Sequence, residues 1–387
     1  MTHRHHTHLA QLAVATIVAA LLASCSSGTH ARSPRRTISS ARTDPTVSTP
    51  HLATTTTPPF HGDVYAYTRA GMLSPAVAGI TTRVYVPNSE SNTVDVIDPN
   101  TYQVIDHFNV GALPQHVTPA WDLRTLYVDN DKGNSLTPID PRTGKPGPTI
   151  PVDDPYNLYF TPDGTKAIVV AERMQRLDFR DPHTWHLIKS VHIPHLGADH
   201  LDFTADGKTL LVSCEFSGWL VRVDVQTMAI TGELRVGGQP IDVKLSPDGS
   251  VMYVANQARA GVSVIDPIGL REVAFIHTGA GAHGLYPSRD GTVLYVSNRV
   301  AGSVSVISFA TRSVVTTWHI GGTPDMGGVS ADGTKLWLTG RYSSAVYVID
   351  TKTGALLHTI RVGKGPHGLD LFPQPGRYSI GHTGNYR

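Results

Sequence analysis

Seven short apolar runs recur along the chain at a nearly constant spacing. They read RVYV, TLYV, AIVV, LLVS, MYVA, LYVS and LWLT. Successive runs lie 41 to 43 residues apart, and no long helical pattern separates them. A period in the low forties, with several short strands in each unit, predicts a β-propeller. The central residues of the runs are Tyr85, Tyr127, Ile168, Leu211, Tyr253, Tyr295 and Trp337.

The unit around Tyr253 shows how one blade is expected to form. Residues 241–245 alternate as a strand, Ser-Pro-Asp-Gly at 246–249 predicts a hairpin turn, and residues 251–255 form the return strand. A third run, GVSVID, starts at Gly261, and a fourth ends before a glycine-rich connection. Each unit therefore predicts four antiparallel strands. The Asp-Gly turn recurs at Asp163-Gly164, Asp206-Gly207, Asp290-Gly291 and Asp332-Gly333.

The two ends of the repeat region are expected to share one blade. Seven innermost strands can be counted, but the one that belongs with residues 83–110 lies at 368–372, near the end of the chain. Pairing the two segments would close the ring and remove open sheet edges. We therefore predict an all-β, seven-bladed propeller over residues 64–376, followed by a C-terminal tail at 377–387.

Three stretches resemble a known family. YVPNSESNTVDVIDPNTYQVI, LYVSNRVAGSVSVISFATRSVV and GPHGLDLFPQPG are similar to the YVTN-type, YncE-like β-propeller repeat proteins of bacteria, which are often exported. The resemblance covers nearly all of residues 64–376 and implies the propeller fold. It implies no particular activity, because many members of the family have none assigned. One copy departs from the pattern, with RMQRLDFR in place of the usual TVSVID.

The first 24 residues have the layout of a secretory signal peptide. Polar residues with Arg4 precede an uncharged apolar stretch at 12–23, which is short for a membrane-spanning helix. The following Leu22-Ala23-Ser24-Cys25 resembles the bacterial lipobox, which implies cleavage before Cys25 and lipidation of Cys25. The alternative is an ordinary cleavage site beside an incidental cysteine.

Residues 25–63 are rich in Ser, Thr and Pro and predict a disordered tether. The expected location is therefore the cell envelope or the outer face of the bacterial cytoplasmic membrane, with the membrane as a partner through the lipid anchor. The only other cysteine, Cys214, leaves no disulfide partner. A net charge of +1 gives no indication of nucleic-acid binding. A closed ring has no free edge to pair, so we expect a monomer.

Polar residues are predicted to gather around one mouth of the central channel. In a propeller, the connection into each innermost strand and the loop between the second and third strands emerge on the same face, where rigid strands position functional side chains. The candidates at the strand starts are His116, Asn157, Asp199, His200, Asp242, His283, Asp325 and His367. The candidates at the ends of the second strands are Glu172, Arg173, Glu215, Arg299 and Arg341.

The histidines of this set are candidate ligands. His116, His200, His283 and His367 can bind a transition-metal ion or shuttle protons near neutral pH. Ring closure predicts that His116 and His367 form the closest pair of the four. The alternative is that these side chains cap the channel by hydrogen-bonding free backbone groups at the strand starts.

The sequence leaves three functions open. The first is a binding platform for a small ligand, a metal ion or a protein partner. The second is a metal-dependent or acid/base enzyme of the lactonase or lyase type, with a channel histidine as base or ligand and Glu172 or Glu215 as its partner. The third is an electron-transfer propeller with a non-covalent, haem-like cofactor. The sequence has no Cys-x-x-Cys-His, no phosphate-binding loop before a helix and no Gly-x-Ser-x-Gly.

Overall fold

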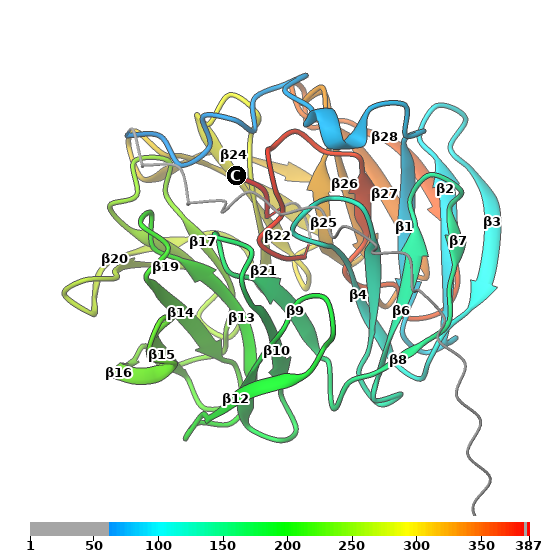
Figure 1. Ribbon diagram of the computed structural model, residues 1–387. Helices are drawn as coiled ribbons and strands as arrows, with labels where there is room; N and C mark the ends of the chain where they lie inside the picture. The colour runs from blue at the N-terminus through cyan, green and yellow to red at the C-terminus, as the bar shows by residue number, and fades with distance from the viewer. Residues whose placement is uncertain (1–61, 383–384) are drawn as a thin grey trace, which may run out of the picture. The chain divides into compact units, whose positions relative to one another are not determined.

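The computed structural model describes residues 62–382 and 385–387, which form a ring of seven antiparallel sheets (Figure 1). The predicted all-β, seven-bladed propeller is confirmed. The helix content of the described part is a single 3-10 turn, η1 (Pro75–Val77). No helix in this part is both long enough and apolar enough to cross a membrane. The predicted signal peptide, Cys25 and nearly all of the predicted tether lie outside the described residues.

Blades 1 to 4 each extend from an innermost strand at the channel to an outermost strand. Blade 1 contains, in that order, β29 (Asp370–Phe372), β1 (Arg83–Asn88), β2 (Thr93–Asp98) and β3 (Gln103–Asn109). Blade 2 contains β4 (Pro114–Pro119), β5 (Leu126–Asn130), β6 (Ser135–Asp140) and the short β7 (Lys145–Pro146) and β8 (Ile150–Pro151). Blade 3 contains β9 (Asn157–Phe160), β10 (Ala167–Ala171), β11 (Arg176–Arg180) and β12 (Leu187–His192). Blade 4 contains β13 (Ala198–Phe203), β14 (Thr209–Cys214), β15 (Trp219–Asp224) and β16 (Ala229–Arg235).

Blades 5 to 7 have the same order. Blade 5 contains β17 (Pro240–Leu245), β18 (Met252–Asn256), β19 (Gly261–Asp266) and β20 (Arg271–His277). Blade 6 contains β21 (Ala282–Pro287), β22 (Val293–Asn298), β23 (Ser303–Ser308) and β24 (Ser313–His319). Blade 7 contains β25 (Pro324–Val329), β26 (Lys335–Gly340), β27 (Ala345–Asp350) and β28 (Leu356–Arg361).

Blade 1 joins the two ends of the ring. Strand β29 pairs antiparallel with β1, with Asp370 opposite Tyr85. A further bridge joins Pro366 to Asn88. The predicted closure is therefore confirmed, although the regular part of the innermost strand begins at Asp370.

The hairpin between the first two strands of most blades is held by a local hydrogen-bond motif. In blade 5, the Ser246 hydroxyl donates to Asp248 Oδ1 at 2.5 Å, and the Ser250 amide donates to the same oxygen at 3.0 Å. Gly249 follows with φ of +69°, which a glycine adopts without the steric cost of a Cβ. This is why the Ser-Pro-Asp-Gly pattern is a reliable turn signal.

The turn between the second and third strands has its own repeated feature. One residue in each blade adopts a left-handed backbone conformation with φ between +45° and +75°. Only two of the seven are glycines, so the sequence does not mark this position. The seven residues are Asn92, Asn134, Gln175, Gly218, Ala260, Gly302 and Ser344.

The hydrophobic core lies between neighbouring blades. One cluster joins blades 3 and 4 and includes Phe179, Phe203 and the fully buried Cys214. Burial raises the pKa of the Cys214 thiol to about 12, so this cysteine is a small apolar filler and not a reactive thiol.

The face of the ring that carries the hairpins between first and second strands is covered by both ends of the described chain. On the N-terminal side, the Val64 amide donates to the carbonyl of Pro247 at 2.7 Å. On the C-terminal side, Ile380 accepts from the Phe160 amide at 3.0 Å, and Gly381 forms a bridge with Tyr159 on β9. The C-terminus accordingly ends near the middle of the ring (Figure 1).

Candidate functional site

A β-bulge at the start of the innermost strands directs the candidate residues toward the channel. In blade 4, Ala198 pairs with Cys214 and Leu201 with Val212, so one extra residue is inserted and Asp199 and His200 lie within the irregular stretch. Bulges of this kind reorient side chains and are frequent beside functional sites. The same register shift brackets the predicted pairs in blades 2, 5, 6 and 7, that is Gln115-His116, Ile241-Asp242, His283-Gly284 and Asp325-Met326.

The loops between second and third strands emerge on the same face as these strand starts. The Glu215 amide donates to the Gly197 carbonyl at 2.7 Å, and the Arg299 amide donates to the Gly281 carbonyl at 2.8 Å. The two sets of candidates predicted from the sequence therefore meet around one opening of the channel, which we call the mouth. The opposite opening carries the C-terminal segment.

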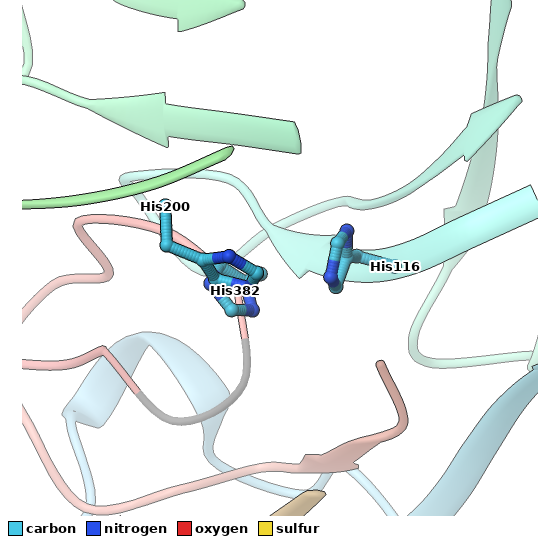
Figure 2. Close-up of side chains that lie close together, drawn as sticks. All are labelled: His116, His200 and His382. Carbon is cyan, nitrogen blue, oxygen red and sulfur yellow. The ribbon is translucent and has the colours of Figure 1, made fainter. Parts of the chain in front are cut away.

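Three histidines meet on the channel axis, and we call them the axial histidines: His116, His200 and His382. Each offers a ring nitrogen, and the three nitrogens lie within 4.8 Å of one another. The ring centroids are 5.5 Å apart for His116 and His200, 4.5 Å for His116 and His382, and 4.7 Å for His200 and His382. Figure 2 shows the three side chains approaching one another from three separate segments of the chain. All three are fully buried.

Two axial histidines are oriented through their Nδ1 atoms. His116 Nδ1 lies 3.0 Å from the carbonyl oxygen of Tyr156, and His200 Nδ1 lies 2.6 Å from Asp199 Oδ1. The Tyr156 carbonyl at Nδ1 fixes the His116 tautomer that leaves the Nε2 lone pair available. In the described residues, Nε2 of His116 and both ring nitrogens of His200 are buried without a hydrogen bond, so His200 and Asp199 are in charge contact only.

Burial controls the charge of the axial histidines. Together with the charge of the nearby His200, it lowers the pKa of His116 to about 3. It also lowers the pKa of His382 well below its usual range. Burial opposes the charge on His200 as well, but the neighbouring Asp199 outweighs it and raises the pKa of His200. His116 and His382 are therefore neutral at pH 7, as metal ligands must be.

A second cluster of His283, Asp325 and His367 lies nearby, also buried and with ligand atoms within 4.8 Å. Here a guanidinium already neutralises the carboxylate: Arg299 Nη2 lies 2.7 Å from Asp325 Oδ1, and His283 Nδ1 lies 2.9 Å from the same oxygen. Arg299 also contacts Nε2 of His283. A cation bound at this carboxylate would have to displace Arg299, so the axial histidines are the better metal site of the two.

The remaining predicted residues have structural or mouth positions. Asn157 Nδ2 donates to the Asp199 carbonyl at 3.4 Å and Asp242 accepts from the Leu285 amide at 2.8 Å, so each side chain bonds the backbone of the innermost strand of the next blade. Arg173 pairs with Asp154 at 2.7 Å.

Two glutamates of the predicted set lie at the mouth and have raised pKa values. Burial, followed by the charge of Asp199, raises the pKa of Glu172 to about 8 and that of Glu215 to about 7. Arg341, also predicted, lies near enough that its charge lowers the pKa of His367. All three residues lie on loops between second and third strands, on the mouth side of the ring.

The predicted proximity of His116 and His367 is confirmed among the four candidate histidines. Their ring centroids are 4.8 Å apart, closer than His116 and His200 or His283 and His367. However, His382 lies closer still to His116, and the sequence pattern does not single it out. It belongs to the segment predicted only as a tail. The sequence does contain one signal that this segment is buried. Apolar and aromatic residues, namely Tyr378, Ile380 and Tyr386, flank His382, and such a density is unusual for a terminus exposed to solvent.

The fold and site together define a closed, seven-bladed β-propeller with a histidine-lined axis. The model of the YncE-like β-propeller family matches residues 65–375, and the chain belongs to this family. No curated protein matches the sequence.

Solved structures share the fold at low sequence identity. A functionally unknown protein from Desulfotomaculum acetoxidans DSM 771 aligns with a TM-score of 0.66 and 16% identity, over 75% of this chain and 98% of the other. A protein described as a putative 6-phosphogluconolactonase from Bacteroides fragilis NCTC 9343 aligns with a TM-score of 0.63 and 18% identity, over 77% and 99%. Dihydro-heme d1 dehydrogenase NirN, in complex with DHE, aligns with a TM-score of 0.59 and 15% identity, over 78% and 77%. Likeness at this level of identity concerns the fold alone.

Proposed function

We propose that the protein is a metal-binding propeller of the cell envelope, with a transition-metal ion held by Nε2 of His116, Nε2 of His200 and a ring nitrogen of His382. The observation that carries the proposal is the convergence of three buried imidazoles whose ligand atoms lie within 4.8 Å of one another.

The donor set favours Zn²⁺, Cu²⁺ or Ni²⁺ over Mg²⁺ or Ca²⁺, because imidazole nitrogens suit the former and oxygen ligands the latter. Three protein ligands with a fourth position left open are typical of a site that binds a further ligand or water, and not of a closed structural site. Asp199 would act behind His200, where a carboxylate strengthens the imidazole as a ligand. The site therefore suits binding of the metal together with something that enters through the mouth.

The envelope location is part of the same proposal. It is supported by the lipobox-like sequence Leu22-Ala23-Ser24-Cys25 and by the apolar stretch before it. In this location a lipid on Cys25 would hold the propeller at the membrane surface, with the segment up to residue 63 as a spacer.

Metal binding can be tested on the purified chain without its first 24 residues. We expect one equivalent of Zn²⁺ per chain in calorimetric titration, and a cobalt-substituted form with the intense visible bands of a tetrahedral nitrogen site. His382→Ala should weaken Zn²⁺ binding about 10- to 100-fold or more. His277→Ala, which removes an exposed histidine on the outer strand β20, is the matched control and should bind as the wild type does.

The outcome that would overturn the proposal is a folded wild-type protein that binds no Zn²⁺, Cu²⁺ or Ni²⁺ at micromolar concentration. Equal Zn²⁺ affinity in wild type and His382→Ala would also overturn it, because the metal would then lie elsewhere.

An acid/base enzyme is the second candidate. The observation in its favour is the pair of mouth glutamates with pKa values of about 8 and 7, which are suited to proton transfer near neutral pH. Aliphatic lactones are the substrates to test first, given the lactonase-like description of one structural neighbour. Turnover that is lost in both Glu172→Gln and Glu215→Gln would support this candidate. An absence of turnover in the metal-loaded wild type would remove it.

A further inference from the structure

One position on the innermost strand recurs in blades 3, 4 and 5, opposite the central residue of the apolar run on the second strand. The residue type at this position differs from blade to blade, and all three side chains are buried. Each of them contacts a different residue of the C-terminal segment. We call them the seat residues: Tyr159, Asp202 and Lys244.

The seat residue of blade 3 contacts both His382 and its neighbour in the chain. Gly381 forms a β-bridge with Tyr159, and a Cβ on Gly381 would meet the Tyr159 ring at 2.4 Å. The ring centroids of Tyr159 and His382 are 5.4 Å apart, and the rings are nearly perpendicular, at 86°. Edge-to-face contacts of this kind are a preferred arrangement of aromatic rings. Tyr159 therefore restricts where the ring of His382 can lie.

The seat residue of blade 5 acts on the other side of His382. Lys244 is 3% exposed, and Lys244 Nζ donates to Asn385 Oδ1. The Asn385 amide donates to the His382 carbonyl at 3.3 Å, and the Asn385 carbonyl accepts from the Ile380 amide at 2.7 Å. A continuous chain of hydrogen bonds thus joins the ammonium group on the ring to the backbone of His382.

An amide oxygen is an unusual partner for a buried ammonium group. Taking an ammonium out of water is costly unless a carboxylate compensates its charge. Among the described residues, no carboxylate forms an ion pair with Lys244, and the carboxylate of the neighbouring seat residue, Asp202, pairs with Arg387 at 2.8 Å. The hydrogen bond of Lys244 is therefore made to the segment that carries His382.

We propose that Lys244 is a positioning residue of the candidate metal site: it holds His382 at the axis through Asn385, and Tyr159 is a second support for the His382 ring. This inference rests on the proposed function, because the axial histidines must bind a metal for the position of His382 to matter. A ligand that is already in place loses less freedom when the metal binds, so the metal is held more tightly.

Positioning and direct electrostatics predict opposite effects when Lys244 loses its charge. An ammonium group near the axis repels a metal cation, so its removal alone would strengthen Zn²⁺ binding. Its removal also frees Asn385, and with it the segment that carries His382, which would weaken Zn²⁺ binding. Weaker binding in a variant without the charge therefore identifies positioning.

The first test compares the wild type with Lys244→Met, which keeps most of the side-chain length and removes the ammonium group. We expect Lys244→Met to bind Zn²⁺ about tenfold or more weakly in calorimetric titration. In the cobalt-substituted form, the intense visible bands of a tetrahedral site should weaken as His382 is lost from the metal. Lys208→Met, which removes an exposed lysine before β14, is the matched control and should bind as the wild type does.

Further variants test whether Lys244 acts through Asn385. Asn385→Leu should lose about as much Zn²⁺ affinity as Lys244→Met. The double variant should lose no more than either single variant, because both changes break the same chain of hydrogen bonds. Asn385→Asp keeps an oxygen acceptor for the ammonium group and should recover the affinity that Asn385→Leu loses. Asn385→Leu leaves the ring itself unchanged, so the test stands even if Lys244→Met folds poorly.

A measurement on metal-free protein follows the positioning itself. We expect the amide protons of Ile380 and Asn385 to exchange with solvent faster in Lys244→Met than in the wild type, as measured by NMR. The thermal unfolding midpoint should stay unchanged, because the lost hydrogen bond is offset by the removal of a buried charge. A purely structural role of Lys244 would lower the midpoint and the Zn²⁺ affinity together.

Two outcomes would overturn the proposal and leave the metal site in place. One is Zn²⁺ affinity in Lys244→Met that equals or exceeds that of the wild type. The other is additive loss of affinity in the double variant, because Lys244 would then act independently of Asn385. A wild-type protein that binds no Zn²⁺ would remove the metal site, and the positioning role with it, so the two failures are distinguishable.

Discussion

The ring centroid of His382 lies 4.5 Å from that of His116. His382 lies near the end of the chain, whereas His116 lies on β4, the innermost strand of blade 2. The chain therefore closes on itself twice. Strand β29 completes blade 1, and the residues after it cross the face opposite the mouth and deliver a histidine to the axis. The candidate metal site is complete only when both closures have formed.

The C-terminal segment is anchored by a buried ion pair. Arg387 Nη2 lies 2.8 Å from Asp202 Oδ1, and both side chains are almost fully buried. Removing one partner of such a pair leaves an uncompensated charge, so Arg387→Ala should lower the free energy of unfolding by about 3 kcal/mol. It should also weaken Zn²⁺ binding, because His382 is then less well positioned.

The control for Arg387 is Arg271→Ala. Arg271 pairs with Asp266 at 3.2 Å, but its side chain is 69% exposed, so the change should cost less than about 1 kcal/mol. Chemical denaturation and zinc titration of both variants provide the measurement. Equal stability of the two variants would contradict the anchoring role of Arg387.

Two truncations distinguish ring closure from the C-terminal segment. A chain that ends at residue 365 lacks β29, which exposes the edge of β1, and we expect it to aggregate or remain unfolded. A chain that ends at residue 376 keeps β29 but loses His382, and we expect it to fold with reduced stability and without the zinc site. Circular dichroism, size-exclusion chromatography and zinc titration check these outcomes. A soluble, cooperatively melting chain ending at 365 would refute the closure by β29.

The fold is predictable because its signals are local and repeated. The apolar runs around Tyr253 and Tyr295 and the Asp-Gly turns each report on a few neighbouring residues, and seven copies remove the ambiguity of any single one. Closure follows from counting strands.

The site is predictable only in part, because it depends on where non-repeated residues lie. His116 and His200 occupy repeated strand-start positions, so the topology places them on the axis. His382 has no counterpart in the repeats, and nothing local shows that its segment turns back through the ring. The separation of the histidines into two clusters is equally hidden, because it depends on Arg299 reaching Asp325 in three dimensions.

The left-handed position between second and third strands gives a prediction about stability. Gly302 and Ala260 occupy this position in neighbouring blades, with φ of +61° and +54°. Gly302→Ala should lower the free energy of unfolding by about 1–2 kcal/mol, because an L-residue is strained there and its Cβ would approach the Gly322 carbonyl oxygen at 3.1 Å. Ala260→Gly should change stability by less than about 1 kcal/mol, because relief of strain is offset by greater freedom of the unfolded chain. Thermal unfolding of both variants is the measurement, and an equal loss in both would contradict the argument.

The predicted lipid anchor can be tested in cells. Cys25→Ser removes the residue that would carry the lipid, so we expect the protein to move from the membrane fraction to the soluble or secreted fraction. Mass spectrometry of the wild-type protein should show an N-terminal peptide that begins at Cys25 with added acyl mass. Ser26→Ala, one residue later, is the matched control and should remain with the membrane. An unmodified Cys25 in the mature protein would favour ordinary cleavage beside an incidental cysteine.

Glu172 gives the molecule a defined pH dependence. Burial and nearby carboxylates raise its pKa in the folded state to about 8, whereas an unfolded glutamate ionises near 4.5. The folded state therefore holds a proton that the unfolded state releases. This contribution to stability is fully present below pH 4.5 and is lost as the pH rises through 8.

Glu172→Gln keeps the shape of the side chain and removes its ionisation, so its advantage over wild type should grow between about pH 5 and pH 8. We expect about 1–2 kcal/mol at pH 8, less than the full shift implies because solvent screens a partly exposed group. Denaturant unfolding at several pH values measures this difference, with Glu90→Gln as an exposed control. A stability advantage that stays constant across this range would show that the carboxyl group of Glu172 ionises as it does in water. Its pKa would then not be raised by burial at the mouth.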